Sequence, residues 1–593
     1  MQNNAITIFV DSVVWECIGT TRAKVSPTPF LDSLKKEGVS ANNLYSHGPY
    51  TDAATRSLLT GRNCLDDYGY YFKLNTAPIN HYKLFHDAGY ETYDFHYPYY
   101  IKGNKVKESI DHSIYFSGFI FGSEWGGLYS YYFEKVKTKP LDDTDYKLII
   151  KRMGYMFESW ISYLSDLINI PESRIMMTRV LKEYDYENKY KLLIKEQATF
   201  NKSPKDYIDS FLKQGPEHIL FSIDNTSMDS YINSSFIGGY IAKKHKNLFR
   251  KIAWINFWVN IKAFPSFKRI FKALWRTIKT KDTDNLIFLQ NYALSLAPMY
   301  VMKSCWTKPR WKHSHSARTN YETAIDILRE RNSDKPFYMF FHVGEPHTSI
   351  AFFSFDRDDK ELIDEELKVL NDYVDQLGTD FVGNLVYFLS IRYTDYVIER
   401  FCNSLKEIGL WDNTSILFVS DHGSSHTYMP LHNRRVNCFD DECYHIPMII
   451  RHPGMKPVEV NSYQYSKDVF PTFADVLGIP QSPYFKGRSM LTEPEERPFV
   501  VTEYMGPGCP DIYSRRIWFS ARDKKYVVAY KVGIYENFED GELAEVYDLQ
   551  NDKNAYYNVN DTIDKSRIQY LLDPIKERFE EIKHDTNLFI SQL

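Results

Sequence analysis

Four groups of residues in the sequence could do chemistry, because each places metal ligands or a hydroxyl beside a short apolar run. Asp11 follows one such run, and the segment 51–62 (TDAATRSLLTGR) begins with a threonine. The other two groups are 342–347 (HVGEPH) and 420–423 (SDHG). Carboxylates combined with imidazoles favour a divalent cation such as zinc, manganese or magnesium. The sequence therefore predicts a metal site.

A divalent cation at these residues would activate an alcohol for attack on an ester. The ion withdraws charge from an ester oxygen and lowers the pKa of a hydroxyl beside it. Thr51 is the hydroxyl that fits this role and is itself a candidate ligand. Asp421 and His422, which are adjacent in sequence, could both bind the same cation, whether one ion or two are held here.

Each of these signals has a structural alternative. An aspartate at a strand end often caps a helix or anchors a loop, and a DHG string often forms a turn. Thr51 could likewise cap the helix that we expect to begin at about Ala53. In the catalytic interpretation, that helix directs free backbone N–H groups at an anionic ester, and Arg56 adds a bidentate contact.

Short apolar strands must position these residues. The runs 5–10, 336–343 and 415–419 are rich in β-branched and aromatic residues, and each leads into Asp, His or Glu. Helical stretches such as 381–408 lie between them. This alternation predicts an α/β fold with a mostly parallel central sheet sandwiched by helices. Sites in such sheets lie beyond the carboxyl ends of the strands.

The same pattern divides the chain into three parts. Residues 1–112 and 318–485 are expected to form the catalytic α/β domain. Residues 113–317 are expected to be a largely helical insertion or cap. Residues 486–593 are expected to form a small α+β C-terminal subdomain with short strands and a closing helix.

Composition narrows the class of protein. The chain has 593 residues, of which 43% are hydrophobic and 25% charged, as is typical of a globular protein. A net charge of -5 argues against a nucleic-acid partner. Seven scattered cysteines without a CxxC pair, and an N-terminus without a signal pattern, predict a cytoplasmic location.

One stretch of the expected insertion, 243–281, contains many Lys and Arg, no Asp or Glu, and several aromatic residues. These are Trp254, Phe257, Trp258, Phe264, Phe267, Phe271 and Trp275. Its apolar part, about 252–264, is shorter than the roughly 20 residues that span a membrane. The stretch either contacts the inner face of a membrane peripherally or packs as a helical cap whose basic face guides the substrate. Both interpretations indicate an anionic or lipid-linked substrate.

These motifs resemble those of the sulfatases and of the related phosphoethanolamine and phosphoglycerol transferases of the alkaline-phosphatase superfamily. The string LLTGR at 58–62 matches the most characteristic part of the sulfatase signature. Counting back from it places Thr51 where sulfatases carry the Cys or Ser that is oxidised to formylglycine. The string DNTSILFVSDHG at 412–423 is similar to the second metal-binding segment of that family.

The resemblance continues toward the C-terminus, where 468–480 is similar to the closing helix of the family and 545–559 to its last strand. It implies an alkaline-phosphatase-like α/β sandwich and a divalent metal held by Asp11, Asp421 and His422 near Thr51. The segment HVGEPH also resembles the histidine-bearing HxxGSH element of the phosphoethanolamine transferases. His432 lies where these transferases carry a further histidine after DHG. The resemblance therefore makes His342, His347 and His432 candidates for substrate binding or for a second metal.

The sequence also departs from the sulfatase pattern. Formylglycine cannot be made from threonine, the CxPSR string is absent and its arginine is displaced to Arg56, and Ser12 replaces a usual second aspartate. Threonine is the nucleophile of the phosphodiesterase and headgroup-transferase branches. The sequence therefore predicts a metal-dependent phosphotransferase or phosphodiesterase in which Thr51 attacks a phosphate ester of a glycan or lipid-linked glycan. The alternatives are a sulfatase-like sulfuric ester hydrolase without formylglycine and a catalytically inactive scaffold.

Overall fold

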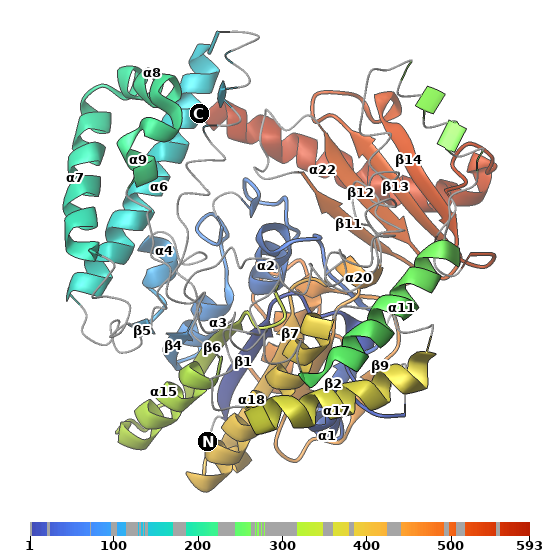
Figure 1. Cartoon of the computed structure of the whole chain (residues 1–593). Coiled ribbons are helices and arrows are strands. Elements are labelled where there is room, and N and C mark those ends of the chain that lie inside the picture. Colours follow the sequence, from blue (N-terminus) through green and yellow to red (C-terminus); the bar gives the residue numbers. More distant parts are fainter. Residues whose placement is uncertain are drawn as a thin grey trace.

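The structure is a computed structural model of the whole chain (Figure 1). It describes residues 3–19, 24–70, 73–95, 104–113, 140–169, 185–222, 244–262, 317–347, 360–378, 385–423, 441–491, 497–505, 516–552 and 558–592, together with single residues between some of these ranges.

An eight-stranded sheet lies at the centre, with the strand order β5-β4-β6-β1-β7-β8-β2-β9. Strand β1 (Asn4–Val10) lies between β6 (Phe337–Val343) and β7 (Thr414–Ser420), and it runs parallel to both. Strand β8 (Met448–Arg451) is antiparallel to its two neighbours. The other strands of this sheet are β2 (Gly38–Ala41), β4 (Glu91–Phe95), β5 (His112–Ser113) and β9 (Val458–Val460). The predicted mostly parallel sheet is confirmed.

Alternation along β1 gives the sheet two apolar faces, because successive side chains of a strand point to opposite sides. Ile6, Ile8 and Val10 belong to one core, whereas Ala5 and Phe9 belong to the other. The first face is covered by α1 (Pro29–Lys35), α11 (Lys246–Lys262), α15 (Ala317–Glu330), α17 (Lys360–Leu377) and α18 (Leu385–Glu407). The second face is covered by α2 (Thr51–Thr60), α3 (His81–Asp87) and α21 (Val469–Val476). Helices therefore sandwich the sheet.

A group of helices from the expected insertion extends the core of the second face. It consists of α6 (Asp143–Asn169), α7 (Tyr186–Lys202), α8 (Pro204–Gln214) and α9 (Ile219–Ser222), which pack together at the left of Figure 1. Most described residues of the insertion are helical, as expected, while its exact boundaries stay predictions. No helix in the described ranges is both long and apolar enough to cross a membrane.

The C-terminal part is a second, antiparallel sheet with one long helix. The sheet comprises β11 (Val500–Tyr504), β12 (Ile517–Arg522), β13 (Tyr526–Val532) and β14 (Glu542–Asp548), and α22 (Gln569–Gln592) packs on it. Arg578 of α22 donates hydrogen bonds to Glu503 and to Asp66, which follows α2. This buried network ties the predicted α+β subdomain to the loop beside the candidate site.

Candidate active site

The predicted metal ligands meet at the carboxyl ends of neighbouring strands. Asp11 follows β1, and Asp421 and His422 follow β7. Because β1 and β7 are parallel neighbours, both strands end at the same edge of the sheet. One ligand atom from each of the three residues lies within 4.8 Å of the other two, and all three residues are buried. The fold thus assembles a cluster from positions about 410 residues apart in sequence.

Thr51 is the first residue of α2, which begins two residues earlier than the predicted start at Ala53. Its hydroxyl oxygen lies 3.1 Å from His422 Nε2 and 3.5 Å from Asp11 Oδ2. The N-cap position belongs to Tyr50, and no side chain caps the helix there. The Thr51 hydroxyl therefore faces the ligand cluster, and the helix N-terminus directs its backbone N–H groups to the same place.

The loop after β1 is fixed against the end of β7 by hydrogen bonds. The backbone N–H groups of Ser12 and His422 donate to Asp421 Oδ1 at 3.0 and 2.8 Å, and Val13 N–H donates to Ser420 Oγ at 2.8 Å. Ser12 adopts a left-handed backbone with φ of 66°. Non-glycine residues take that conformation at a cost, so the surrounding hydrogen bonds must hold it in place.

Tyr387 of α18 forms hydrogen bonds with the same loop. Its hydroxyl donates to the Ser12 carbonyl at 2.8 Å and accepts from Val14 N–H at 3.0 Å. Ser12 Oγ in turn donates to Asp11 Oδ1 at 2.6 Å. These contacts leave the carboxylate little freedom to rotate.

The donor atoms suit a divalent cation. His422 Nδ1 lies 2.6 Å from the Gly423 carbonyl and donates to it, which leaves the lone pair of Nε2 directed toward the carboxylates. Asp421 Oδ2 is buried and accepts no hydrogen bond within the described part of the chain. A Cβ on Gly423 would lie 1.7 Å from the Glu442 carbonyl oxygen, so this close approach requires glycine. A buried carboxylate oxygen that accepts no hydrogen bond from the described residues, beside an imidazole nitrogen whose lone pair faces the carboxylates, fits a metal ligand set.

The electrostatics of the two aspartates differ. Burial raises the pKa of Asp11, but the imidazoles of His347, His342 and His422 outweigh it and hold that pKa well below its usual range. Burial, followed by the charge of Asp11, raises the pKa of Asp421. Burial lowers the pKa of His422, which favours the neutral form that binds metals. A cation would stabilise the ionised forms of both carboxyl groups.

Two of the three predicted histidines lie beside this cluster. His342, in β6, has Nε2 at 3.6 Å from Asp11 Oδ2, and the charge of His347 lowers the pKa of Asp11. Glu345 between them accepts the N–H of Ala317 at 2.5 Å and so caps the start of α15. His432 lies outside the described residues.

Arg56 is not directed at the cluster. Its guanidinium, 1% exposed, donates to the carbonyl oxygens of Asp66 and Asp67 at 3.2 Å each and to that of Lys73. Burial lowers its pKa to about 10, so it remains cationic. The displacement of the arginine by one position explains this finding, since one residue turns a side chain by about 100° around a helix. The expected bidentate contact with the ester is not supported by this geometry.

Several residues beside the cluster were not predicted. Ser12, Ser420 and Tyr387 position the ligands, and their partners lie hundreds of residues away in sequence. Lys73, with φ of 53°, holds its Nζ 2.7 Å from Asp52 Oδ1, next to Thr51. Ser420 carried a local signal because it belongs to the SDHG string, and Ser12 was noted only as the residue that replaces a usual aspartate.

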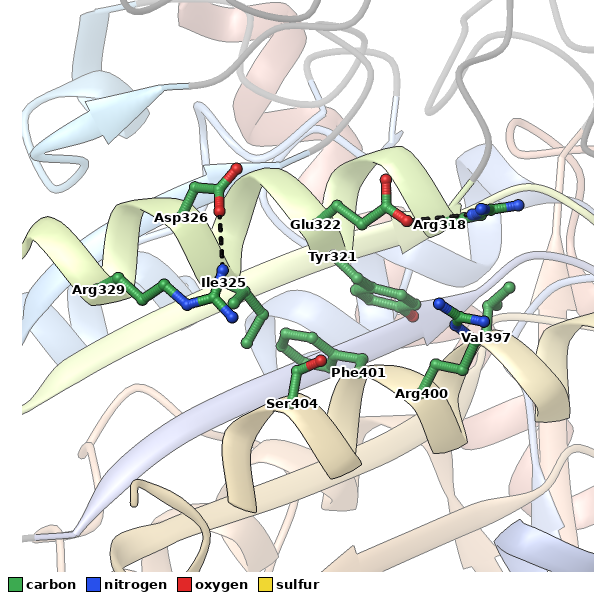
Figure 2. A pocket seen from close by; sticks show the side chains of 10 residues that line it. All are labelled: Arg318, Tyr321, Glu322, Ile325, Asp326, Arg329, Val397, Arg400, Phe401 and Ser404. Carbon is green, nitrogen blue, oxygen red and sulfur yellow. Dashed lines mark hydrogen bonds and ion pairs between the residues drawn. The ribbon is translucent and has the colours of Figure 1, made fainter. Parts of the chain in front are cut away.

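A groove between α15 and α18 lies apart from this cluster (Figure 2). It has a volume of about 360 Å³ and a floor of buried apolar side chains such as Tyr321 and Phe401. Ion pairs border it, Arg318 with Glu322 at 3.1 Å and Arg329 with Asp326 at 3.3 Å. No residue predicted for the site lines it.

Comparison with known proteins defines the family. A protein-family model described as Sulfatase matches residues 3–125 and 151–479, which is more than half of the chain. The chain therefore belongs to the sulfatase family, as the motifs indicated.

The individual relatives share low sequence identity with this chain or align with only part of it. Lipoteichoic acid synthase 2 of Bacillus subtilis is 31% identical over 140 residues, covering 22% of this chain and 21% of that protein. An arylsulfatase of Clostridium perfringens is 26% identical over 297 residues, covering 45% of this chain and 59% of that protein. A solved phosphonate monoester hydrolase of Agrobacterium radiobacter is 14% identical with a TM-score of 0.49, covering 98% of this chain and 96% of that one. The chain thus spans less than two thirds of each of these two curated relatives.

Proposed function

We propose that this protein is a metal-dependent phosphotransferase or phosphodiesterase in which Thr51 attacks a phosphate ester. The observation that carries the proposal is the position of the Thr51 hydroxyl, 3.1 Å from His422 Nε2 and 3.5 Å from Asp11 Oδ2. A side chain that cannot become formylglycine thus faces the candidate metal ligands. That combination favours attack by an unmodified hydroxyl.

Asp11, Asp421 and His422 would hold a divalent cation, zinc, manganese or magnesium. When bound, the ion supplies Lewis acidity that lowers the pKa of a hydroxyl and withdraws charge from an ester oxygen. A second ion would need ligands beyond these three.

The reaction proceeds in two displacements. The Thr51 hydroxyl gives up its proton, and its oxygen forms a bond to phosphorus. The bond from phosphorus to the leaving alcohol breaks, and the alcohol takes up a proton, so no proton is gained or lost overall. Water or an acceptor hydroxyl then displaces Thr51 and gives hydrolysis or transfer, respectively. The N–H groups at the start of α2 stabilise the anionic ester, and His342 and His347 contact its oxygens.

The proposed substrate is the phosphate ester of a glycan or of a lipid-linked glycan. Support comes from the relatives named lipoteichoic acid synthase, one 31% and one 30% identical over short segments. The cytoplasmic location stays a prediction.

A sulfuric ester hydrolase without formylglycine is the second candidate function. The arylsulfatase of Clostridium perfringens, aligned over 45% of this chain, favours it. The two candidates share the first step of attack. The preferred ester, phosphate or sulfate, distinguishes them.

The test compares Thr51→Ala with a matched control, Thr60→Ala, which lies at the far end of the same helix. Turnover of p-nitrophenyl phosphate diesters, phosphate monoesters and sulfate is measured with zinc or manganese present. We expect Thr51→Ala to lower the turnover of the preferred ester by about 10³-fold or more. Thr60→Ala should remain active, and the wild type should carry a covalent phosphoryl group on the peptide that contains Thr51.

Full metal-dependent turnover by Thr51→Ala would refute the proposal. A preference for the sulfate ester would instead support the hydrolase. An inactive scaffold predicts that the wild type neither binds metal nor turns over any of the three esters.

A further inference from the structure

Helix α11 presents two unlike faces. Leu248, Ile252 and Ile255 are buried in the core that also contains residues of α17 and α18. Trp254 and Trp258, by contrast, are 61% and 41% exposed, and their rings meet edge to face at 5.6 Å. Burying an aromatic ring of this size is strongly favourable, so two exposed tryptophans on one helix suggest a partner.

Polar contacts hold α11 in this orientation. Lys251 Nζ donates to Asn371 and Asp375 of α17, at 2.9 and 2.5 Å. His245 Nε2 lies 2.7 Å from Asp364 of the same helix. Figure 1 shows α11 beside α17 at the edge of the molecule. The tryptophans are therefore directed outward by a docked helix.

Further exposed apolar side chains follow α11 in the sequence. Five further side chains in helical conformation are 41% to 78% exposed, namely Phe267, Phe271, Leu274, Trp275 and Ile278. Their spacing of four, seven, eight and eleven residues from the first places them on one helical stripe. With the two tryptophans they make up seven of the fourteen large hydrophobic side chains that are exposed among the described residues. We call these seven residues the aromatic face.

The charge of this stretch limits the choice of partner. Residues 243–281 contain twelve Lys or Arg and no Asp or Glu, although the whole chain carries a net charge of -5. In the sequence, Lys268, Arg269, Lys272 and Arg276 lie between the residues of the stripe. An apolar stripe with tryptophan, flanked by cations and without acids, is the composition of helices that lie in a membrane interface.

We propose that the aromatic face binds the surface of an anionic lipid bilayer. The aromatic rings enter the boundary between headgroups and acyl chains, and the cations contact anionic headgroups. The stretch lies along the surface of the bilayer. This inference goes beyond the proposed function, because it does not depend on Thr51 or on the metal ligands.

The test measures binding of the full chain to vesicles. Sedimentation with phosphatidylcholine vesicles is compared with sedimentation with vesicles that also contain phosphatidylglycerol. We expect binding to the anionic vesicles only, with weaker binding at high salt. The double variant Trp254→Ser, Trp258→Ser should bind at least about tenfold more weakly. The control Tyr484→Ser removes a 53% exposed ring outside the aromatic face and should bind as the wild type does.

Two further measurements keep the outcomes distinct. Turnover of a soluble ester should be the same in the double variant and in the wild type, while Thr51→Ala should bind vesicles normally. Equal binding of the double variant, or no binding of the wild type to anionic vesicles, would overturn the proposal. So would a change of oligomeric state in the double variant without lipid, because the aromatic face would then be a contact between protein chains.

Discussion

Arg56 provides the sharpest test of the difference between the sequence pattern and the structure. The displaced arginine of the signature suggests a catalytic contact, whereas the structure gives its guanidinium three backbone carbonyl partners and an ion pair with Asp67 at 3.7 Å. Replacing it with methionine keeps most of the apolar stem and removes every donor. We therefore expect Arg56→Met to lower the free energy of unfolding, while the protein that remains folded keeps most of its turnover.

The magnitude follows from what the substitution leaves behind. Hydrogen bonds from a charged group contribute about 1.5–3 kcal/mol each, but they do not add when they share one side chain. Asp67 keeps its ion pair with Arg62 at 2.6 Å, so the loss comes from the three carbonyl oxygens that lose their donor. We expect the free energy of unfolding to fall by about 3 kcal/mol. Arg56→Lys should be intermediate, because a single ammonium cannot reach all three carbonyl oxygens.

Thermal unfolding and turnover, measured on the same preparations, distinguish a structural role of Arg56 from contact with the substrate. Arg329→Met is the control, since its side chain is 53% exposed and its pair with Asp326 lies on the surface. It should change the free energy of unfolding by less than about 1 kcal/mol. If Arg56→Met keeps the melting temperature of the wild type but loses turnover, the reasoning is wrong and Arg56 contacts the substrate.

Two further predictions concern buried carboxyl groups. Asp421→Asn removes a ligand and also the repulsion with Asp11 that raises the Asp421 pKa. Without metal, we expect the variant to melt at a higher temperature than the chelator-treated wild type. Added zinc should stabilise the wild type by about 2.7 kcal/mol at a hundredfold excess over Kd, but it should not stabilise the variant. Zinc stabilisation of the variant equal to that of the wild type would contradict the ligand assignment. Asp395 accepts the N–H groups of Phe30 and Leu31, and burial raises its pKa to about 7. The folded state therefore holds this proton more tightly than the unfolded chain, so the free energy of unfolding falls as pH rises from about 4 toward 7. In Asp395→Asn, the melting temperature should change less with pH between about 4 and 7 than it does in the wild type. The same pH dependence in both proteins would contradict the role of Asp395.

The strand ends could be predicted because their signal is local. A short apolar run that stops at a polar residue marks where a buried strand ends, and this holds for β1, β6 and β7. The strings LLTGR and SDHG, in this order along the chain, predicted the sulfatase family. The match of the family model over residues 3–125 and 151–479 confirms it. The start of α2 was placed two residues late, because threonine often precedes a helix as its N-cap, whereas here Tyr50 holds that position and Thr51 is the first helical residue.

The sequence by itself determined the class of fold, the family and the residue types that could bind a metal. Only the tertiary structure decided which of them meet, because the parallel pairing of β6, β1 and β7 is set by long-range packing. It also decided that Arg56 is buried, since the direction of a side chain depends on the register of its helix against the sheet. Tyr387 and Ser12 show the same dependence, because their contact joins residues 375 positions apart and no local pattern encodes it.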